Sequence, residues 1–122
     1  MRFRNIIGSV VFALSFLHLS AIASELAARS KASELREPGY ESQALPIFWS
    51  DAAFMRTCVP VNAPLPKPFS MYVIISTSGA TVDQAAEPLT PVAQCIFKNT
   101  KSRRYPAPKE EYVFKINMEF NP

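Results

Sequence analysis

The sequence predicts a small α+β domain: a three-stranded antiparallel sheet of β-β-α-β order, with one main helix on one face and a short N-terminal helix. Residues 69–76 and 112–120 alternate with a period of two, which is typical of strands with one buried face. Thr90-Pro91 is typical of a helix start, because a capping hydroxyl precedes a proline at the first helical position. A chain of 122 residues allows one such domain.

A hairpin joins the first two predicted strands. After the first strand, Thr77-Ser78-Gly79-Ala80 supplies a turn that contains glycine, and Thr81 to Ala86 forms a weaker second strand that Pro88 ends. The helix then reverses direction, so the last strand runs antiparallel to the first and lies beside it. The predicted strand order is therefore 2-1-3, with the last strand at an edge.

The edge strand is the clearest element of the sequence. Every second residue from Tyr112 to Phe120 is apolar, and the intervening positions include Lys115 and Glu119. Charged side chains on an edge protect it from indiscriminate pairing. An open edge is also a place where an extended peptide can add as a further strand.

The region before the sheet divides into two parts. Residues 24–45 are polar and have a thin apolar stripe, so we expect a flexible lead-in. Residues 46–66 are expected to hold a short helix, which Ser50 caps and which ends before Pro60, and a proline-rich connector. Four prolines within 60–68 favour an extended spacer. Residues 67–122 then form the β-β-α-β domain.

Residues 1–23 have the three parts of a secretory signal peptide. Arg2 and Arg4 precede an apolar run, and Ala21-Ile22-Ala23 matches the small residues that a signal peptidase reads. We expect cleavage after Ala23 and location in the periplasm, with secretion as the alternative; a retained membrane anchor is the competing interpretation. The remaining chain has 11 basic and 10 acidic residues, so nucleic-acid capture by charge is disfavoured.

Cys58 and Cys95 are the only cysteines and both follow the predicted signal. An even count in an exported chain indicates one disulfide. A two-cysteine metal site is the alternative, but it would lack histidine and the Cys-x-x-Cys spacing.

Residues that could carry catalysis are sparse. The only histidine, His18, belongs to the predicted signal, and no glycine-rich phosphate loop is present. We therefore expect a non-catalytic protein with no metal and no cofactor.

A basic cluster lies at and beyond the end of the predicted helix: Lys98, Lys101, Arg103 and Arg104. Cations at a helix C-terminus complement the helix dipole, which is the simpler interpretation. The alternative is a docking patch for phosphate, lipid headgroups or an acidic partner, which would allow weak membrane-surface contact.

The order of short motifs resembles the C-terminal domain of TonB and related energy-transducer-like proteins over residues 67–120. The resemblance lies in the strand Phe69-Ser-Met-Tyr-Val-Ile-Ile-Ser, Ser78-Gly79, Val92-Ala93-Gln94-Cys95, Arg104-Tyr105-Pro106-Ala107-Pro108 and the closing strand Val113-Phe-Lys-Ile-Asn-Met-Glu-Phe120. The chain departs from TonB in its cleavable apolar segment and in its spacer of only nine residues, 60–68. Such a spacer reaches roughly 28 Å, too short to carry force across the periplasm.

The resemblance implies that the last strand accepts a protein or peptide partner by strand addition. Carried over to this chain, it points to the backbone of 112–120 and to the edge residues Tyr112, Val113, Lys115, Asn117 and Glu119. Self-pairing of two edges into a homodimer is a variant of this expectation.

Two other functions stay open as alternatives. One is a small secreted inhibitor or immunity-type protein that acts through a loop, either Ser50–Pro68 or Tyr105–Pro108. The other is a TonB-like transducer, which requires that the N-terminal segment be retained.

Overall fold

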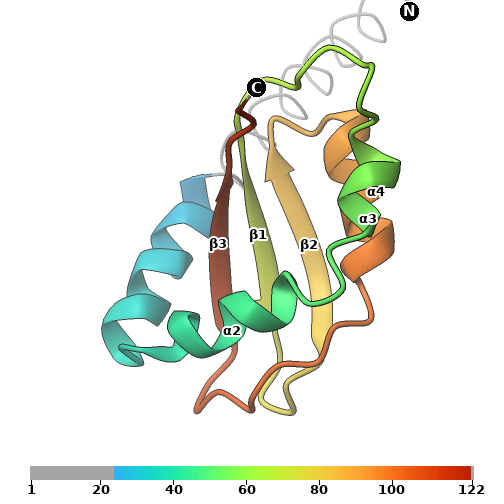
Figure 1. Ribbon diagram of the computed structural model, residues 1–122. Coiled ribbons are helices and arrows are strands. Elements are labelled where there is room, and N and C mark those ends of the chain that lie inside the picture. Colours follow the sequence, from blue (N-terminus) through green and yellow to red (C-terminus); the bar gives the residue numbers. More distant parts are fainter. Residues whose placement is uncertain (1–23, 122) are drawn as a thin grey trace, which may run out of the picture.

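Three antiparallel strands form the centre of the fold, in the order β2-β1-β3 (Figure 1). The computed structural model describes residues 24–121. The strands are β1 (Phe69–Ile75), β2 (Thr81–Glu87) and β3 (Tyr112–Met118); the helices are α2 (Tyr40–Phe48), α3 (Phe54–Cys58) and α4 (Pro91–Thr100). Residues 24–36 are also helical. The predicted α+β class and the 2-1-3 order are confirmed.

The pairing of β1 with β3 is continuous over seven residue pairs, from Phe69 opposite Met118 to Ile75 opposite Tyr112. The even-numbered residues of β3 are buried in the main core, as their periodicity predicts. The strand is two residues shorter than the alternation from 112 to 120 suggests, because β1 offers partners only as far as Met118.

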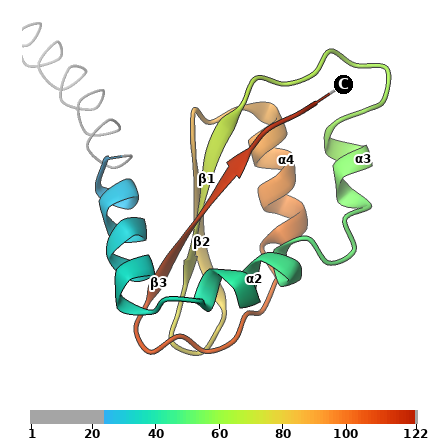
Figure 2. The same ribbon diagram turned by 60° about the vertical axis from the view of Figure 1, so that its left-hand side comes forward.

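Helices lie on both faces of the sheet. Figure 2 shows α3 and α4 on one side and the helix of residues 24–36 on the other. The main core lies on the first side, where Ile96 and Ala93 of α4 pack with Met71, Val73 and other buried side chains of the strands. The prediction of one covered face is therefore incomplete.

The expectation of a flexible lead-in over 24–45 is wrong. Leu26 packs against Tyr72 and Val113 on the second face of the sheet, and Ser30 and Ser33 of the same helix are buried. Two of the three inward positions are serines, so a count of apolar residues underestimates how far this helix is buried. Tyr40 and Ala44 of α2 are buried in the main core.

The short helix before Pro60 exists, but it begins later than expected. Its cap is Ala53, whereas Ser50 lies in the turn after α2 and donates its hydroxyl to the Ile47 carbonyl. The residues before Ser50 continue α2 through Pro46. Phe48, at the end of α2, is fully buried, and its burial offsets part of the cost of the backbone hydrogen bond that a proline inside a helix removes.

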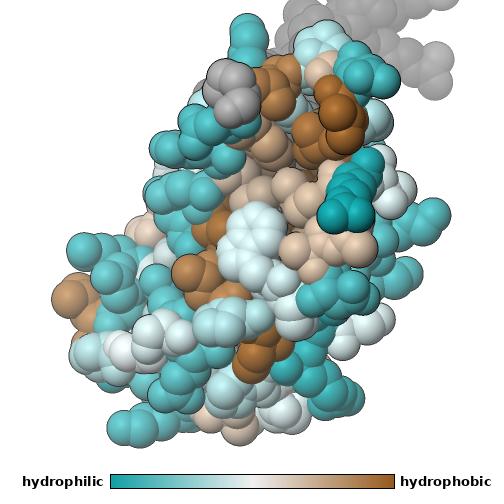
Figure 3. Space-filling model, viewed as in Figure 1, coloured by the Kyte–Doolittle hydropathy of each residue, from teal (hydrophilic) through white to brown (hydrophobic). Residues whose placement is uncertain are grey.

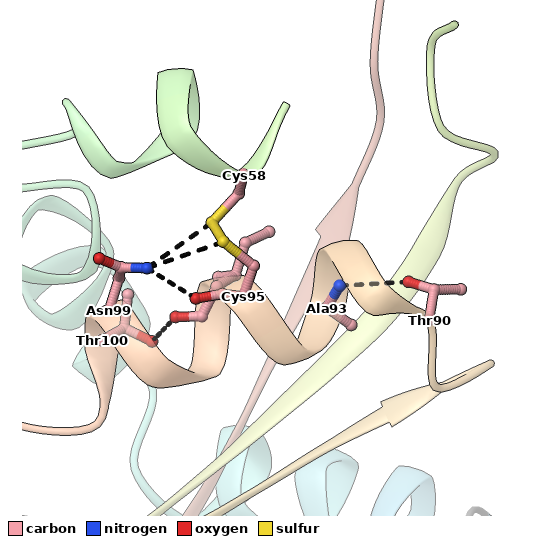
Figure 4. Close-up of a disulfide and its surroundings, with 7 residues drawn as sticks. Cys58, Thr90, Ala93, Cys95, Asn99 and Thr100 are labelled. Atoms are coloured by element: carbon pink, nitrogen blue, oxygen red, sulfur yellow. Dashed lines mark hydrogen bonds between the residues drawn. A yellow bond between two sulfur atoms is a disulfide. The ribbon is translucent and has the colours of Figure 1, made fainter. Parts of the chain in front are cut away.

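The predicted disulfide joins α3 to α4 (Figure 4). The Cα atoms of Cys58 and Cys95 are 5.5 Å apart, and 37 positions separate them in the sequence. Thr90 caps α4 as predicted, because its hydroxyl accepts the backbone N–H of Ala93 at 3.1 Å. The disulfide therefore ties a five-residue helix to a well-formed one.

The hairpin turn is hydrogen-bonded to the segment that precedes β3. Gly79 has a φ of +87°, and its carbonyl accepts the N–H of Tyr105 at 2.8 Å. The Tyr40 hydroxyl donates to the carbonyl of Pro106 at 2.7 Å. Both Tyr105 and Pro108 are buried. The segment 105–108 is thus fixed to the body of the domain.

Within residues 24–121, no helix has the length and apolarity needed to cross a membrane. The predicted signal peptide and its cleavage site at Ala23 lie outside the described residues.

Candidate functional site

The outer side of β3 presents backbone groups that do not pair within the sheet. The Val113 N–H donates to the Ser33 hydroxyl at 3.1 Å, so it points away from β1. Because the pairing with β1 has no bulge, the backbone groups two and four residues further on, at Lys115 and Asn117, point the same way. Neither of these two amides has an acceptor among the described residues.

A groove runs beside this edge on the side of α2. It has a volume of about 370 Å³. Residues of α2 and its C-cap form one wall and residues of β3 form the other: Glu41, Ser42, Leu45 and Trp49 opposite Phe114, Lys115, Ile116 and Asn117. Leu45 is 42% exposed although it is apolar. Figure 3 shows apolar side chains gathered across the middle of this face, between α2 and α3.

The helix of residues 24–36 closes one end of the edge. Its Ser33 is 2% exposed and Val113 is 1% exposed, so the hydrogen bond between them is shielded from water. Arg29 forms an ion pair with Glu111, and Arg36 pairs with Glu110 at 2.8 Å. Glu37, just beyond the helix, accepts the N–H of Lys109 at 2.9 Å. The edge is therefore covered at Val113 and open from Lys115 onward.

Charges of both signs border the open part. Lys115 is exposed on the face of β3 opposite to α2, and Glu119, just after the end of the strand, is also exposed. On the α2 side, partial burial raises the pKa of the Glu41 carboxyl above its ordinary value, the nearby Tyr112 hydroxyl lowers it, and Glu34 raises it. The groove thus has an apolar centre with a carboxyl group at one end.

The structure separates the five predicted edge residues into two groups. Lys115, Asn117 and Glu119 are exposed. Tyr112 is buried, with its ring centroid 4.4 Å from that of Tyr40, and Val113 is covered by the N-terminal helix. The accessible part of the edge therefore starts three residues later than the sequence suggests.

Sequence reasoning missed the two helices that frame the edge. The predicted boundary between lead-in and connector, after residue 45, divides the α2 wall, although Tyr40, Ala44 and Phe48 recur at a spacing of four residues, which is typical of one helical face. For the other helix, Leu26, Ser30 and Ser33 have helical spacing, but a serine at an inward position gives no hydropathy signal.

The predicted basic cluster is divided in the structure. Arg103 points inward: its guanidinium donates to the Ser50 carbonyl and lies 5.7 Å from the centre of the Phe54 ring. Lys98, Lys101 and Arg104 are exposed. Three cations remain at the surface, and Arg103 instead holds the turn after α2 against the end of α4.

No group of three or more histidine, cysteine, aspartate or glutamate side chains is arranged to hold a metal ion within the described range 24–121. Both cysteines are joined in the disulfide. Among the described residues, the open edge with its groove is the feature most suited to recognise another molecule.

No protein-family model, curated protein or solved structure matches this chain.

Proposed function

We propose that this protein is an exported, non-catalytic interaction domain that binds a protein or peptide partner as a strand added to the open edge of β3. The observation that carries the proposal is the pair of outward-facing amides at Lys115 and Asn117, beside a groove of about 370 Å³. An added strand would satisfy both amides and the carbonyls of the same residues.

The groove supplies what backbone pairing lacks, which is selectivity. In strand addition the main-chain hydrogen bonds give affinity, and pockets for alternate side chains give specificity. Every second side chain of the partner would face α2, where Leu45 and Trp49 offer apolar surface. The other side chains would lie beside Lys115 and Glu119, so the partner is expected to be apolar on one face and charged on the other.

Two further observations support an exported interaction domain. A signal peptide over residues 1–23 would direct the chain to an oxidising compartment, and a disulfide such as Cys58–Cys95 persists in such compartments. The resemblance to TonB C-terminal domains, in which the last strand accepts a peptide, agrees with the use of β3. We propose the periplasm as the location, with secretion as the alternative.

Asn117→Pro tests the proposal. Proline removes an outward-facing N–H that has no acceptor among the described residues, so the fold should survive while strand addition is lost. Asn117→Ala is the matched control because it removes the same side chain and keeps the N–H. We expect both variants to retain the circular dichroism spectrum of the wild type, and only the alanine variant to capture a partner from periplasmic extract.

If folded Asn117→Pro captures the same partner as the wild type, the proposal is wrong. The exposed loop before β1 would then lead as the binding surface, in the manner of a small inhibitor. Val61 in that loop is 92% exposed although it is apolar, and Leu65 is also exposed. Loss of capture on Val61→Ser or Leu65→Ser would identify this second candidate.

A further inference from the structure

Exposed side chains follow one another at a spacing of two residues along β3 and just beyond it: Lys115 and Asn117 lie in the strand, and Glu119 follows its last residue, Met118. Their charges are positive, neutral and negative in that order. If an identical strand runs antiparallel beside β3, with Asn117 opposite itself, each Lys115 lies directly opposite a Glu119. The edge is therefore complementary in charge to a copy of itself.

Two neighbouring registers, centred on Lys115 and on Ile116, are less favourable than the register centred on Asn117. A register centred on Lys115 would place two lysines directly opposite each other, which is destabilising. It would also require the Val113 N–H to pair with the second strand, although this N–H already donates to the Ser33 hydroxyl. A register centred on Ile116 would place each Lys115 opposite Asn117 and would again bring Val113 into the ladder. The register centred on Asn117 pairs opposite charges twice, and the ladder ends before Val113.

We infer that the partner of the open edge can be a second copy of this chain, paired antiparallel about Asn117 in a continuous six-stranded sheet. This inference rests on the proposed function, because it uses the same edge. The backbone groups of Lys115, Asn117 and Glu119 form the intermolecular ladder, and the N-terminal helix limits it at Val113. The two Lys115–Glu119 pairs select the register.

The groove fits the same arrangement. In this register residues 117–120 of the second copy lie opposite 114–117, the strand residues that line the groove. Phe120 of the second copy then lies on the α2 side, next to the exposed Leu45 and to Trp49. Phe120 is only partly buried in its own chain, where its ring centroid is 5.8 Å from that of Phe69. Its free surface is thus available for the groove.

Charge exchange tests the inference on protein purified after expression of the full chain. Analytical ultracentrifugation should show that the wild-type protein is a dimer. The dimer dissociation constants of Lys115→Glu and of Glu119→Lys should be at least about tenfold higher, because each change places like charges opposite one another at two positions. The double variant Lys115→Glu/Glu119→Lys keeps the wild-type net charge and should restore the dimer. An equimolar mixture of the two single variants should also dimerise, because both of its charge pairs are attractive.

Cysteine cross-linking fixes the register. In an Asn117-centred pair the two Asn117 Cα atoms are about 5.5 Å apart, within the range for a disulfide. The two Lys115 positions are offset by four residues, roughly 13 Å along the strand, and cannot join. We expect Asn117→Cys to form a covalent dimer on oxidation and Lys115→Cys to stay monomeric.

The inference fails if the wild-type protein is monomeric up to about 1 mM, if the double variant does not recover the dimer, or if Lys115→Cys cross-links as readily as Asn117→Cys. These outcomes are distinct from failure of the proposed function. A monomeric protein that loses partner capture on Asn117→Pro, but not on Asn117→Ala, would retain the function and exclude only the second copy as its partner.

Discussion

The Ser33 hydroxyl accepts the backbone N–H of Val113 at 3.1 Å, and this one contact divides the edge of β3 into a covered part and an open part. The same hydroxyl donates to the Arg29 carbonyl at 2.9 Å, so its orientation is set by its own helix. A helix that the sequence presents as a polar lead-in thus determines where an added strand has to stop.

Ser33→Ala should destabilise the protein through this contact. The change leaves the Val113 amide buried without an acceptor, which costs about 1–3 kcal/mol of unfolding free energy. Ser30→Ala is the matched control, because Ser30 is buried in the same helix but makes no hydrogen bond to β3 in the described structure. Chemical denaturation measures the unfolding free energy of each variant. Equal, small effects of the two changes would contradict the role given to Ser33.

Loss of the Cys58–Cys95 disulfide should lower the unfolding free energy by more than the Ser33→Ala change does. The loop that it closes spans 37 positions, and the loop-entropy relation gives about 3–4 kcal/mol for a closure of that size. The double variant Cys58→Ser/Cys95→Ser should show this loss in denaturation experiments and keep the strand signals of the circular dichroism spectrum. Two free thiols on alkylation of protein taken directly from its compartment would show that the pair is not formed there.

Gly79→Ala should be far more damaging than Gly39→Ala. Both glycines have a positive φ, which costs a residue with a side chain roughly 1–2 kcal/mol. At Gly79 an added Cβ would also lie 2.1 Å from the Tyr105 carbonyl oxygen, whereas at Gly39 nothing lies within 4 Å. The difference between the two melting temperatures isolates the clash. Similar melting temperatures would mean that segment 105–108 can move away freely.

Alkaline pH should unfold the protein as its buried tyrosines ionise, with the two events coupled. Burial, with a smaller effect of Glu37, raises the pKa of Tyr40 to about 12. Burial also raises the pKa of Tyr105 to about 12, although the Arg103 charge acts to lower it. A raised folded-state pKa gives stability that is complete below the ordinary value of 10.0 and is lost as the pH rises from there through about 12.

An ultraviolet titration of phenolate absorbance, followed together with circular dichroism, checks this expectation. We expect little phenolate near pH 10 and then a joint change in both signals as the chain unfolds. The denatured protein serves as the control and should titrate near 10. A gradual phenolate signal centred on pH 10, with the fold intact, would contradict the burial of these side chains.

The strands and α4 could be predicted because their signals are local. Alternation sets the buried side of β1 and β3, and Thr90-Pro91 starts α4. The positions of Lys115, Asn117 and Glu119 on the exposed side follow from the same alternation. The Cys58–Cys95 disulfide is also predictable, because the chain has an even count of cysteines and both follow the predicted export signal.

The helices that frame the site have weak or conflicting signals in the sequence, and their tertiary contacts decide the outcome. Ser30 and Ser33 are buried in the N-terminal helix, and the hydroxyl of Ser33 bonds to β3. Pro46 argues against a helix, yet α2 continues through it as Phe48 enters the core. The groove lies between α2 and β3, which are far apart in the sequence, so only the three-dimensional structure defines it.

Amide hydrogen exchange on β3 tests the central claim most directly, measured on dilute free protein and on the same protein saturated with a bound partner. In the free protein, Lys115 and Asn117 should exchange fast, whereas Val113 and the even-numbered amides that face β1 should exchange slowly. Binding should slow exchange at Lys115 and Asn117 and leave Val113 unchanged. Fast exchange at Lys115 and Asn117 in the saturated complex would show that the partner binds elsewhere and that the edge of β3 is not the binding surface.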